Sequence, residues 1–221
     1  MDPTFAFQAV IFDLDGTLVD SAPGILMSFE NVLKRAGIKP LIPLNESLIG
    51  PPLRQTMAIL TGVTLCKDLD VLVEHFKESY DSIGYKATRA YDGINSLLSC
   101  LQDKQITMAI ATNKRMVPTL KILKFLGWEH YFREVGALDS VTPPYKNKAS
   151  LISALLDKIA VAAASSVYIG DKREDGEAAD ANQMPFIAVG WGFGKWRAEP
   201  LKSGWSHVTS AVEAMEMLID V

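Results

Sequence analysis

Residues 9–17 of the 221-residue chain read AVIFDLDGT, and this stretch decides the fold class. Four apolar residues in succession, Ala9 to Phe12, predict a short strand that is buried on both faces, as strands of parallel sheets are. Asp13 and Asp15 follow at the end of this strand, and Gly16 permits the backbone to turn sharply away. The first predicted strand therefore brings two carboxylates to one edge of a sheet.

Beyond residue 88 the sequence alternates between strand and helix patterns. Short apolar runs predict strands at 106–111, near 135, at 166–170 and at 186–189. Apolar residues at helical spacing predict helices at about 94–101, 117–126, 148–158, 174–182 and 210–219. This alternation is typical of a parallel sheet with helices on both faces.

The segment between the first strand and residue 88 has only helical patterns. Helices are predicted over about 21–36, 53–60 and 68–83, and Gly37, Gly62 and Gly84 end them. No strand is expected between about 20 and 87. We therefore predict an α/β fold with a Rossmann-like parallel-sheet core formed by residues 1–19 and 88–221, and an α-helical cap domain inserted at 20–87.

Composition narrows the class of protein and its partners. Hydrophobic residues make up 48% of the chain, and 22 Lys and Arg against 26 Asp and Glu give a net charge of −4, so a basic surface for nucleic acid is not expected. No apolar run approaches the roughly 18 residues of a membrane span, and the first residues lack the pattern of a signal peptide. Cys66 and Cys100 form no CxxC pair, and we expect two reduced thiols in the core. The prediction is a cytoplasmic protein, a monomer or weak dimer, with no nucleic-acid or membrane partner.

Polar side chains follow several of the predicted strands. Ligands of open parallel sheets bind at the carboxyl ends of the strands, where these side chains would meet. They are Asp13 and Asp15 after the first strand, Thr112 and Asn113 after the second, Asp171 and Asp175 after the strand at 166–170, and Lys146 and Lys148 at the start of a helix. Taken singly, each has a structural explanation, such as a helix cap for the later acids or a solvated helix start for the lysines.

Taken together, the carboxylates predict a bound cation. Two carboxylates and a phosphate dianion repel one another, at about 4 kcal/mol for each pair separated by ~4 Å at an effective dielectric constant of ~20. Hard oxygen ligands favour Mg²⁺, which uses few carboxylates together with water and substrate phosphate. We therefore predict Mg²⁺ at this edge of the sheet.

Other chemistries find no support in the sequence. There is no GxSxG nucleophile elbow and no GxxxxGK[ST] phosphate loop. Residues 190–194, GWGFG, fit no dinucleotide fingerprint, and we expect them to form a flexible flap near the site. Trp191, Trp196 and Trp205 are expected to form a packed cluster.

Residues 12–18, FDLDGTL, after an apolar strand resemble the first motif of the haloacid dehalogenase superfamily. Thr112-Asn113, a downstream lysine and residues 170–175, GDKRED, match the later motifs in order. The helical insertion resembles the subclass with a four-helix cap, and residues 49–53, IGPPL, resemble the cap loop of phosphoglycolate-phosphatase-like members. Asp15 distinguishes the chain from true dehalogenases, which lack this second acid.

The resemblance implies a Mg²⁺-dependent phosphatase that hydrolyses a small, phosphoglycolate-like phosphomonoester through an aspartyl-phosphate. Asp13 would attack phosphorus, and Asp15 would protonate the leaving group and then activate water. Asp171 would hold Mg²⁺ with Asp13 and the backbone carbonyl of Asp15, supported by Asp175. This scheme agrees with phosphoryl transfer, in which positioning and charge neutralisation do most of the work.

The same resemblance implies the substrate-binding residues. Thr112 and Asn113 would bind the phosphoryl oxygens, and a lysine would neutralise their charge. We choose Lys148, because KAxxI at the start of a helix resembles one branch of these phosphatases, with Lys146 as the alternative. Arg54 of the cap is the candidate for contact with the rest of the substrate.

Three alternative functions stay open at this point. A sugar phosphomutase of the same fold shares the acid pair. A phospho-acceptor signalling protein also combines strand-end Asp, Thr and Lys, although it would have no use for a helical cap. A binding protein without turnover is the third. Release of phosphate from a generic aryl phosphate would distinguish the phosphatase from the signalling protein and from the binding protein.

Overall fold

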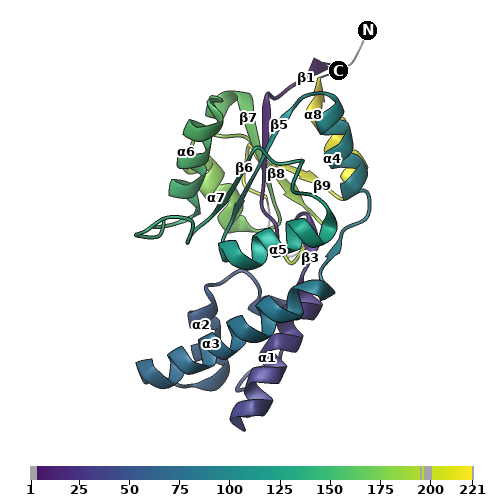
Figure 1. Cartoon of the computed structure of the whole chain (residues 1–221). Coiled ribbons are helices and arrows are strands. Elements are labelled where there is room, and N and C mark those ends of the chain that lie inside the picture. The colour runs from purple at the N-terminus through teal and green to yellow at the C-terminus, as the bar shows by residue number, and fades with distance from the viewer. Residues whose placement is uncertain (1–3, 195, 197–200, 221) are drawn as a thin grey trace.

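The computed structural model describes residues 4–194, 196 and 201–220, and Figure 1 shows its two parts: an α/β core and a helical unit below it. The core contains one parallel sheet of six strands in the order β6-β5-β2-β7-β8-β9. These strands are β6 (Glu134–Ala137), β5 (Thr107–Thr112), β2 (Ala9–Phe12), β7 (Ser166–Gly170), β8 (Phe186–Val189) and β9 (Ser206–Val208). The predicted α/β fold with a parallel sheet is confirmed. Strand β9 was not predicted, because it is short and two of its three residues are polar.

Helices cover both faces of the sheet (Figure 1). They are α4 (Ile94–Asp103), α5 (Met116–Leu126), α6 (Lys148–Ile159), α7 (Arg173–Ala181) and α8 (Ala211–Leu218). Side chains alternate between the faces along a strand, so Val10 and Phe12 of β2 pack with α4, α5 and α8. Ala9 and Ile11 pack with α6 and α7 on the other face. Because β2 is buried on both faces, its residues must all be apolar, as the sequence predicted.

The helical unit follows β2 and has an apolar core of its own. It consists of α1 (Ala22–Ala36), the short turn η1 (Glu46–Leu48), α2 (Leu53–Thr61), α3 (Cys66–Ser82) and the short turn η2 (Gly84–Ala87). The three predicted helices are present. A pair of short antiparallel strands, β3 (Val19–Asp20) and β4 (Arg89–Ala90), joins the unit to the core and was not predicted. The domain limits at 20 and 87 stay a prediction.

Short elements near the chain ends complete the core. Strand β1 (Thr4–Phe5) pairs with β10 (Ile219–Asp220), and the turn η3 (Ala163–Ser165) precedes β7. No helix among the described residues is both long enough and apolar enough to cross a lipid bilayer.

Two expectations about side chains were wrong. Cys66 is exposed at the start of α3 and Cys100 is only half-buried, so neither thiol lies in the core. Trp196 and Trp205 do pack edge to face, with ring centroids 6.0 Å apart. Trp191 instead packs against the other face of the sheet, and its Nε1 donates to the carbonyl of Thr17. The three tryptophans therefore do not form one cluster.

Gly24 of α1 provides a test of packing in the helical unit. A Cβ at this position would overlap the carbonyl oxygen of Gly84. Helix propensity alone favours Gly24→Ala by about 1 kcal/mol, but overpacking against backbone costs about 1–3 kcal/mol, and backbone has no rotamer to relieve the clash. We expect Gly24→Ala to lower the free energy of unfolding measured by urea denaturation. Met27→Ala, on the exposed side of the same helix, should change it little. A higher urea midpoint for Gly24→Ala would contradict the packing argument.

Candidate active site

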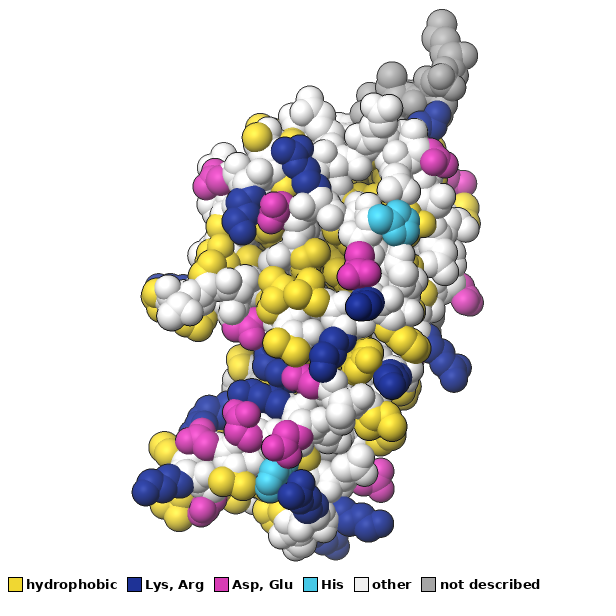
Figure 2. Space-filling view, viewed as in Figure 1, with side chains coloured by type: hydrophobic (Ala, Val, Ile, Leu, Met, Phe, Trp, Pro, Cys, Tyr) yellow, Lys and Arg dark blue, Asp and Glu magenta, His cyan; other side chains and the backbone are white. Residues whose placement is uncertain are grey.

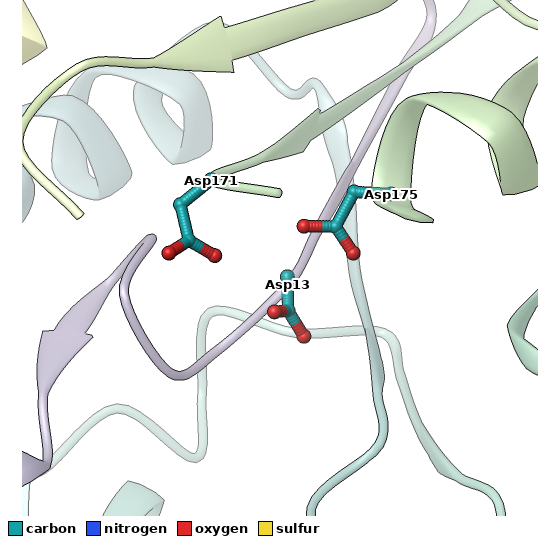
Figure 3. A group of neighbouring side chains, drawn as sticks. All are labelled: Asp13, Asp171 and Asp175. Carbon is teal, nitrogen blue, oxygen red and sulfur yellow. The ribbon is translucent and has the colours of Figure 1, made fainter. Parts of the chain in front are cut away.

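Three buried carboxylates meet at the carboxyl end of the sheet and are called the acidic cluster below. Asp13 directly follows β2, Asp171 directly follows β7, and Asp175 lies in the first turn of α7. One oxygen of each lies within 4.8 Å of one oxygen of each of the others, and Figure 3 shows the three side chains converging. The structure thus brings together three of the carboxylates that the sequence assigned to one site.

Burial and mutual repulsion disfavour the charged forms of this cluster. Burial raises the pKa of Asp13 to about 6, against the opposing effect of Lys148, and the charges of Asp175 and Asp15 add to the rise. Burial and the charges of Asp175 and Asp13 also raise the pKa of Asp171 well above its ordinary value. The cluster is therefore electrostatically costly without added positive charge.

Lys148 supplies part of that positive charge. It is the first residue of α6, which Asn147 caps through its side chain, and it is buried. Its Nζ donates to Oδ1 of Asp175 at 2.5 Å and lies 3.2 Å from Oδ1 of Asp13. Burial alone would lower the pKa of Lys148, but the two carboxylates outweigh it and raise this pKa well above its ordinary value. Lys146, the alternative lysine, is exposed before the helix begins.

Asp15 lies beside the acidic cluster but has a different partner. The Nζ of Lys114 lies 3.0 and 3.1 Å from its two carboxylate oxygens and 4.5 Å from the ring centre of Tyr80. The backbone N–H of Lys114 donates to Oγ1 of Thr112 at 3.2 Å. Lys114 was missed in the sequence, although it directly follows Thr112-Asn113 at the same edge of the sheet. Its place after a strand was the signal that could have found it.

Two glycines allow the chain to close around Asp171. Gly16 has a φ of +84°, and a Cβ there would overlap the carboxylate of Asp171. A Cβ at Gly192 would overlap the carbonyl of Gly16, so the loop 190–194 lies directly against the turn after β2. The backbone N–H of Phe193 donates to Oδ2 of Asp171 at 2.7 Å. The predicted flap is therefore near the site, and it holds one of the carboxylates.

A cavity of about 520 Å³ separates this edge of the sheet from the helical unit. The site residues that line it are Asp13, Asp15, Thr112, Asn113, Lys114, Lys148 and Asp175. Arg115 joins the two parts at its rim, through hydrogen bonds of 2.9 and 2.6 Å to the carboxylate of Asp81 in α3. Figure 2 shows basic and acidic side chains interspersed along this junction on the face in view.

Arg54 corrects the sequence prediction. Its guanidinium pairs with Asp70 on the exposed surface of the helical unit, and Arg54 does not line the cavity. The reason is geometric, because α2 presents neighbouring residues to different sides. Leu53, Gln55 and Thr56 face the cavity, and Arg54 faces α3.

Several known proteins are similar to this chain in sequence. Tyrosine-protein kinase PtkA of Mycobacterium tuberculosis is 32% identical over 189 residues, which cover 85% of this chain and 64% of that protein. This chain therefore spans slightly less than two thirds of that relative. A 5'-nucleotidase of Pseudomonas aeruginosa is 33% identical, with 87% of each chain covered. A phosphoglycolate phosphatase of Xanthomonas campestris is 31% identical, with 88% of each covered.

Structural similarity leads to the same family. The crystal structure of a predicted phosphatase from Clostridium acetobutylicum superposes with a TM-score of 0.82 at 28% identity, covering 95% of this chain and 97% of that one. The family model of the haloacid dehalogenase-like hydrolases matches residues 10–189, from β2 to the end of β8. This match includes the acidic cluster, Asp15, Lys114 and Lys148, and it shows that the chain belongs to the haloacid dehalogenase-like hydrolases.

Proposed function

We propose that this chain is a Mg²⁺-dependent phosphatase that hydrolyses a small phosphomonoester through an aspartyl-phosphate intermediate. One observation carries the proposal: Asp13 lines the cavity, with the ammonium of Lys148 3.2 Å from its Oδ1 and the other carboxylates of the acidic cluster beside it. A carboxylate at a cavity wall with a cation beside it can attack phosphorus while the phosphoryl charge is neutralised. The names of the relatives give different substrates. We therefore propose small phosphomonoesters as the substrate class, with phosphoglycolate as one candidate within it.

In the first step an oxygen of Asp13 forms a bond to phosphorus as the bond to the ester oxygen breaks. Asp15 gives a proton to the departing oxygen. In the second step Asp15 takes a proton from water, the water oxygen attacks phosphorus, and the bond to Asp13 breaks to release phosphate. Lys114 contacts both oxygens of Asp15 and so fixes the carboxylate beside the cavity.

The acidic cluster has the ligands that Mg²⁺ would require. Among the described residues, Oδ1 of Asp171 is buried without a hydrogen-bond partner, and Oδ1 of Asp13 also accepts no hydrogen bond, although the ammonium of Lys148 lies 3.2 Å from it. Buried carboxylate oxygens of this kind suit a hard divalent cation. Asp13, Asp171 and Asp175 would hold the ion, and the backbone carbonyl of Asp15 remains a predicted ligand. When bound, Mg²⁺ would neutralise charge on the phosphoryl group and on the carboxylates.

We further propose that residues 20–87 act as a cap domain that encloses the substrate, and that the protein is a cytoplasmic monomer or weak dimer whose partner is a small phosphorylated metabolite. The cavity between the helical unit and the sheet supports the first point. Cys66 and Cys100 form no disulfide, as is usual in a reducing compartment.

The proposed function predicts Mg²⁺-dependent release of phosphate. The purified protein should release phosphate from p-nitrophenyl phosphate, and a screen of phosphoglycolate, sugar phosphates, nucleotides and pyrophosphate should find better substrates. Activity should disappear in excess chelator and return with Mg²⁺, whereas Ca²⁺ should support it poorly because of its larger and looser coordination shell. No hydrolysis of any compound with Mg²⁺ present would refute the proposal. A strict requirement for a bisphosphorylated sugar would favour the mutase.

Asp13→Asn tests the nucleophile. The amide keeps the shape of the side chain but cannot form the aspartyl-phosphate, so we expect kcat to fall by ~10³-fold or more. The circular dichroism spectrum should be unchanged. Activity close to that of the wild type would rule out the covalent route.

Alanine variants of Lys148 and Lys146 test which lysine supplies the positive charge beside Asp13. We expect Lys148→Ala to lower kcat by ~10²-fold or more, because a buried ammonium next to the phosphoryl group is lost. Lys146→Ala removes an exposed charge and should be nearly neutral. Circular dichroism and urea denaturation of both variants would separate loss of activity from loss of folding. The opposite ranking would assign the charge to Lys146.

The raised pKa of Asp13 predicts a pH-dependent stability in chelator. The folded state favours the protonated acid, so this contribution to stability is fully present below about pH 4 and is lost as pH rises through about 6. A shift from 3.8 to about 6 corresponds to a loss on the order of 3 kcal/mol. Between pH 4 and 7, the free energy of unfolding of the wild type should fall by about this amount relative to Asp13→Asn. Mg²⁺ should restore it at pH 7. Parallel pH curves for the two proteins would show the argument to be wrong.

A further inference from the structure

We propose that the leaving group of the substrate is uncharged and largely apolar, and that the site discriminates against phosphomonoesters that carry a second anionic group. This inference rests on the proposed function and names its substrate class. It follows from the part of the cavity wall that faces away from the acidic cluster.

The wall that the helical unit contributes has no charged side chain. All residues between 20 and 87 are described, and no Lys, Arg, His, Asp or Glu among them lines the cavity. The wall is formed mainly by apolar and aromatic side chains, among them Ile25, Phe29, Leu48, Leu53, Phe76 and Tyr80. The neutral polar residues Ser47, Gln55 and Thr56 complete it. A carboxylate or second phosphate held against this wall would lose its hydration without gaining a counter-charge.

Each basic side chain in the described part of the cavity wall already has a partner within the protein. Lys148 contacts Asp13 and Asp175, and Lys114 contacts both oxygens of Asp15. The phosphoryl group itself would use Lys148, so this ammonium is not left for a second anion.

The other two basic residues join the core to the helical unit. Arg115 binds the carboxylate of Asp81 through two hydrogen bonds. The ammonium of Lys172 donates to the carbonyl of Ile49, and Gly50, with a φ of +109°, leaves the space that this approach requires. A second anionic group would have to displace Asp81 from Arg115, or share the ammonium of Lys172 with the carbonyl of Ile49 and the carboxylate of Asp171, on which the charge of Lys172 already acts.

The acidic side chains that line the cavity add to the discrimination against a second anionic group. Asp15 and Glu174 line it together with Asp13 and Asp175, and their charges oppose a further anion. By contrast, a volume of about 520 Å³ with an apolar wall suits a ring or a branched hydrocarbon chain. The lack of an available cation on this wall weighs against phosphoglycolate and against the bisphosphorylated sugars of a mutase as substrates.

Two pairs of esters of equal size separate the effect of charge in the wild-type enzyme with Mg²⁺. In each pair a carboxamide replaces the carboxylate: 4-carbamoylphenyl phosphate is compared with 4-carboxyphenyl phosphate, and 2-phosphoglycolamide with phosphoglycolate. We expect kcat/KM to be at least tenfold higher for the amide of each pair, with the aromatic amide ahead of the aliphatic one. Equal or higher kcat/KM for the carboxylated members overturns the inference and leaves the phosphatase assignment intact. Hydrolysis of none of the four esters, nor of p-nitrophenyl phosphate, overturns both.

Gln55→Arg tests the wall directly, because it places a cation on the cavity side of α2. We expect it to shift the ratio of the two kcat/KM values at least fivefold toward 4-carboxyphenyl phosphate. Val71→Arg adds the same charge on the exposed surface of α3, outside the cavity, and should leave the ratio unchanged. An unchanged ratio in a folded Gln55→Arg protein would show that the missing cation does not determine selectivity, as would equal shifts in both variants.

Discussion

The contact of one buried ammonium with two buried carboxylates underlies the rest of this site. Lys148 lies between Asp13 and Asp175, and all three side chains are withdrawn from solvent. Removing ions from water costs several kcal/mol each, and their attraction offsets that cost only with close geometry and further hydrogen bonds. One further bond is present, because the backbone N–H of Lys172 donates to Oδ2 of Asp175 at 3.0 Å. Even so, the three carboxylates of the acidic cluster outnumber the single ammonium of Lys148.

The parallel sheet makes this arrangement attainable. Asp13, Thr112 and Asp171 come from segments far apart in the sequence, but each directly follows or ends one of three adjacent strands, β2, β5 and β7. The strands fix the backbone of these residues, and the apolar clusters on both faces hold the strands. Rigid placement matters for phosphoryl transfer, in which most of the rate enhancement comes from positioning and electrostatics.

The sequence predicted the parts of the molecule that depend on strong local patterns. The predicted bounds of buried strands such as β2, and of helices that end at a glycine, lie within a few residues of the observed ones. The expectation that strand ends meet at one edge of the sheet correctly brought Asp13, Asp171 and Asp175 together. What it did not predict depends on contacts between distant segments. The position of Lys114 just after β5 marked it only as a candidate, and its role becomes clear through its contacts with Asp15 and Tyr80. That Arg54 points away from the cavity becomes clear only through its ion pair with Asp70. Strands β3 and β4 have two residues each, too few to leave a pattern.

That short pair of strands has an architectural consequence. Because Val19 pairs with Ala90 and Asp20 with Arg89, the chain leaves the α/β core and returns to it at one point. The intervening segment is therefore a loop whose ends already touch, so it can be lengthened, replaced or excised while the strand order of the main sheet is kept. Every residue that the proposed chemistry uses lies outside this loop, whereas the uncharged wall of the cavity lies within it. Under the proposed function, new substrate ranges would arise by exchange of this single module, with the residues of the proposed chemistry unchanged.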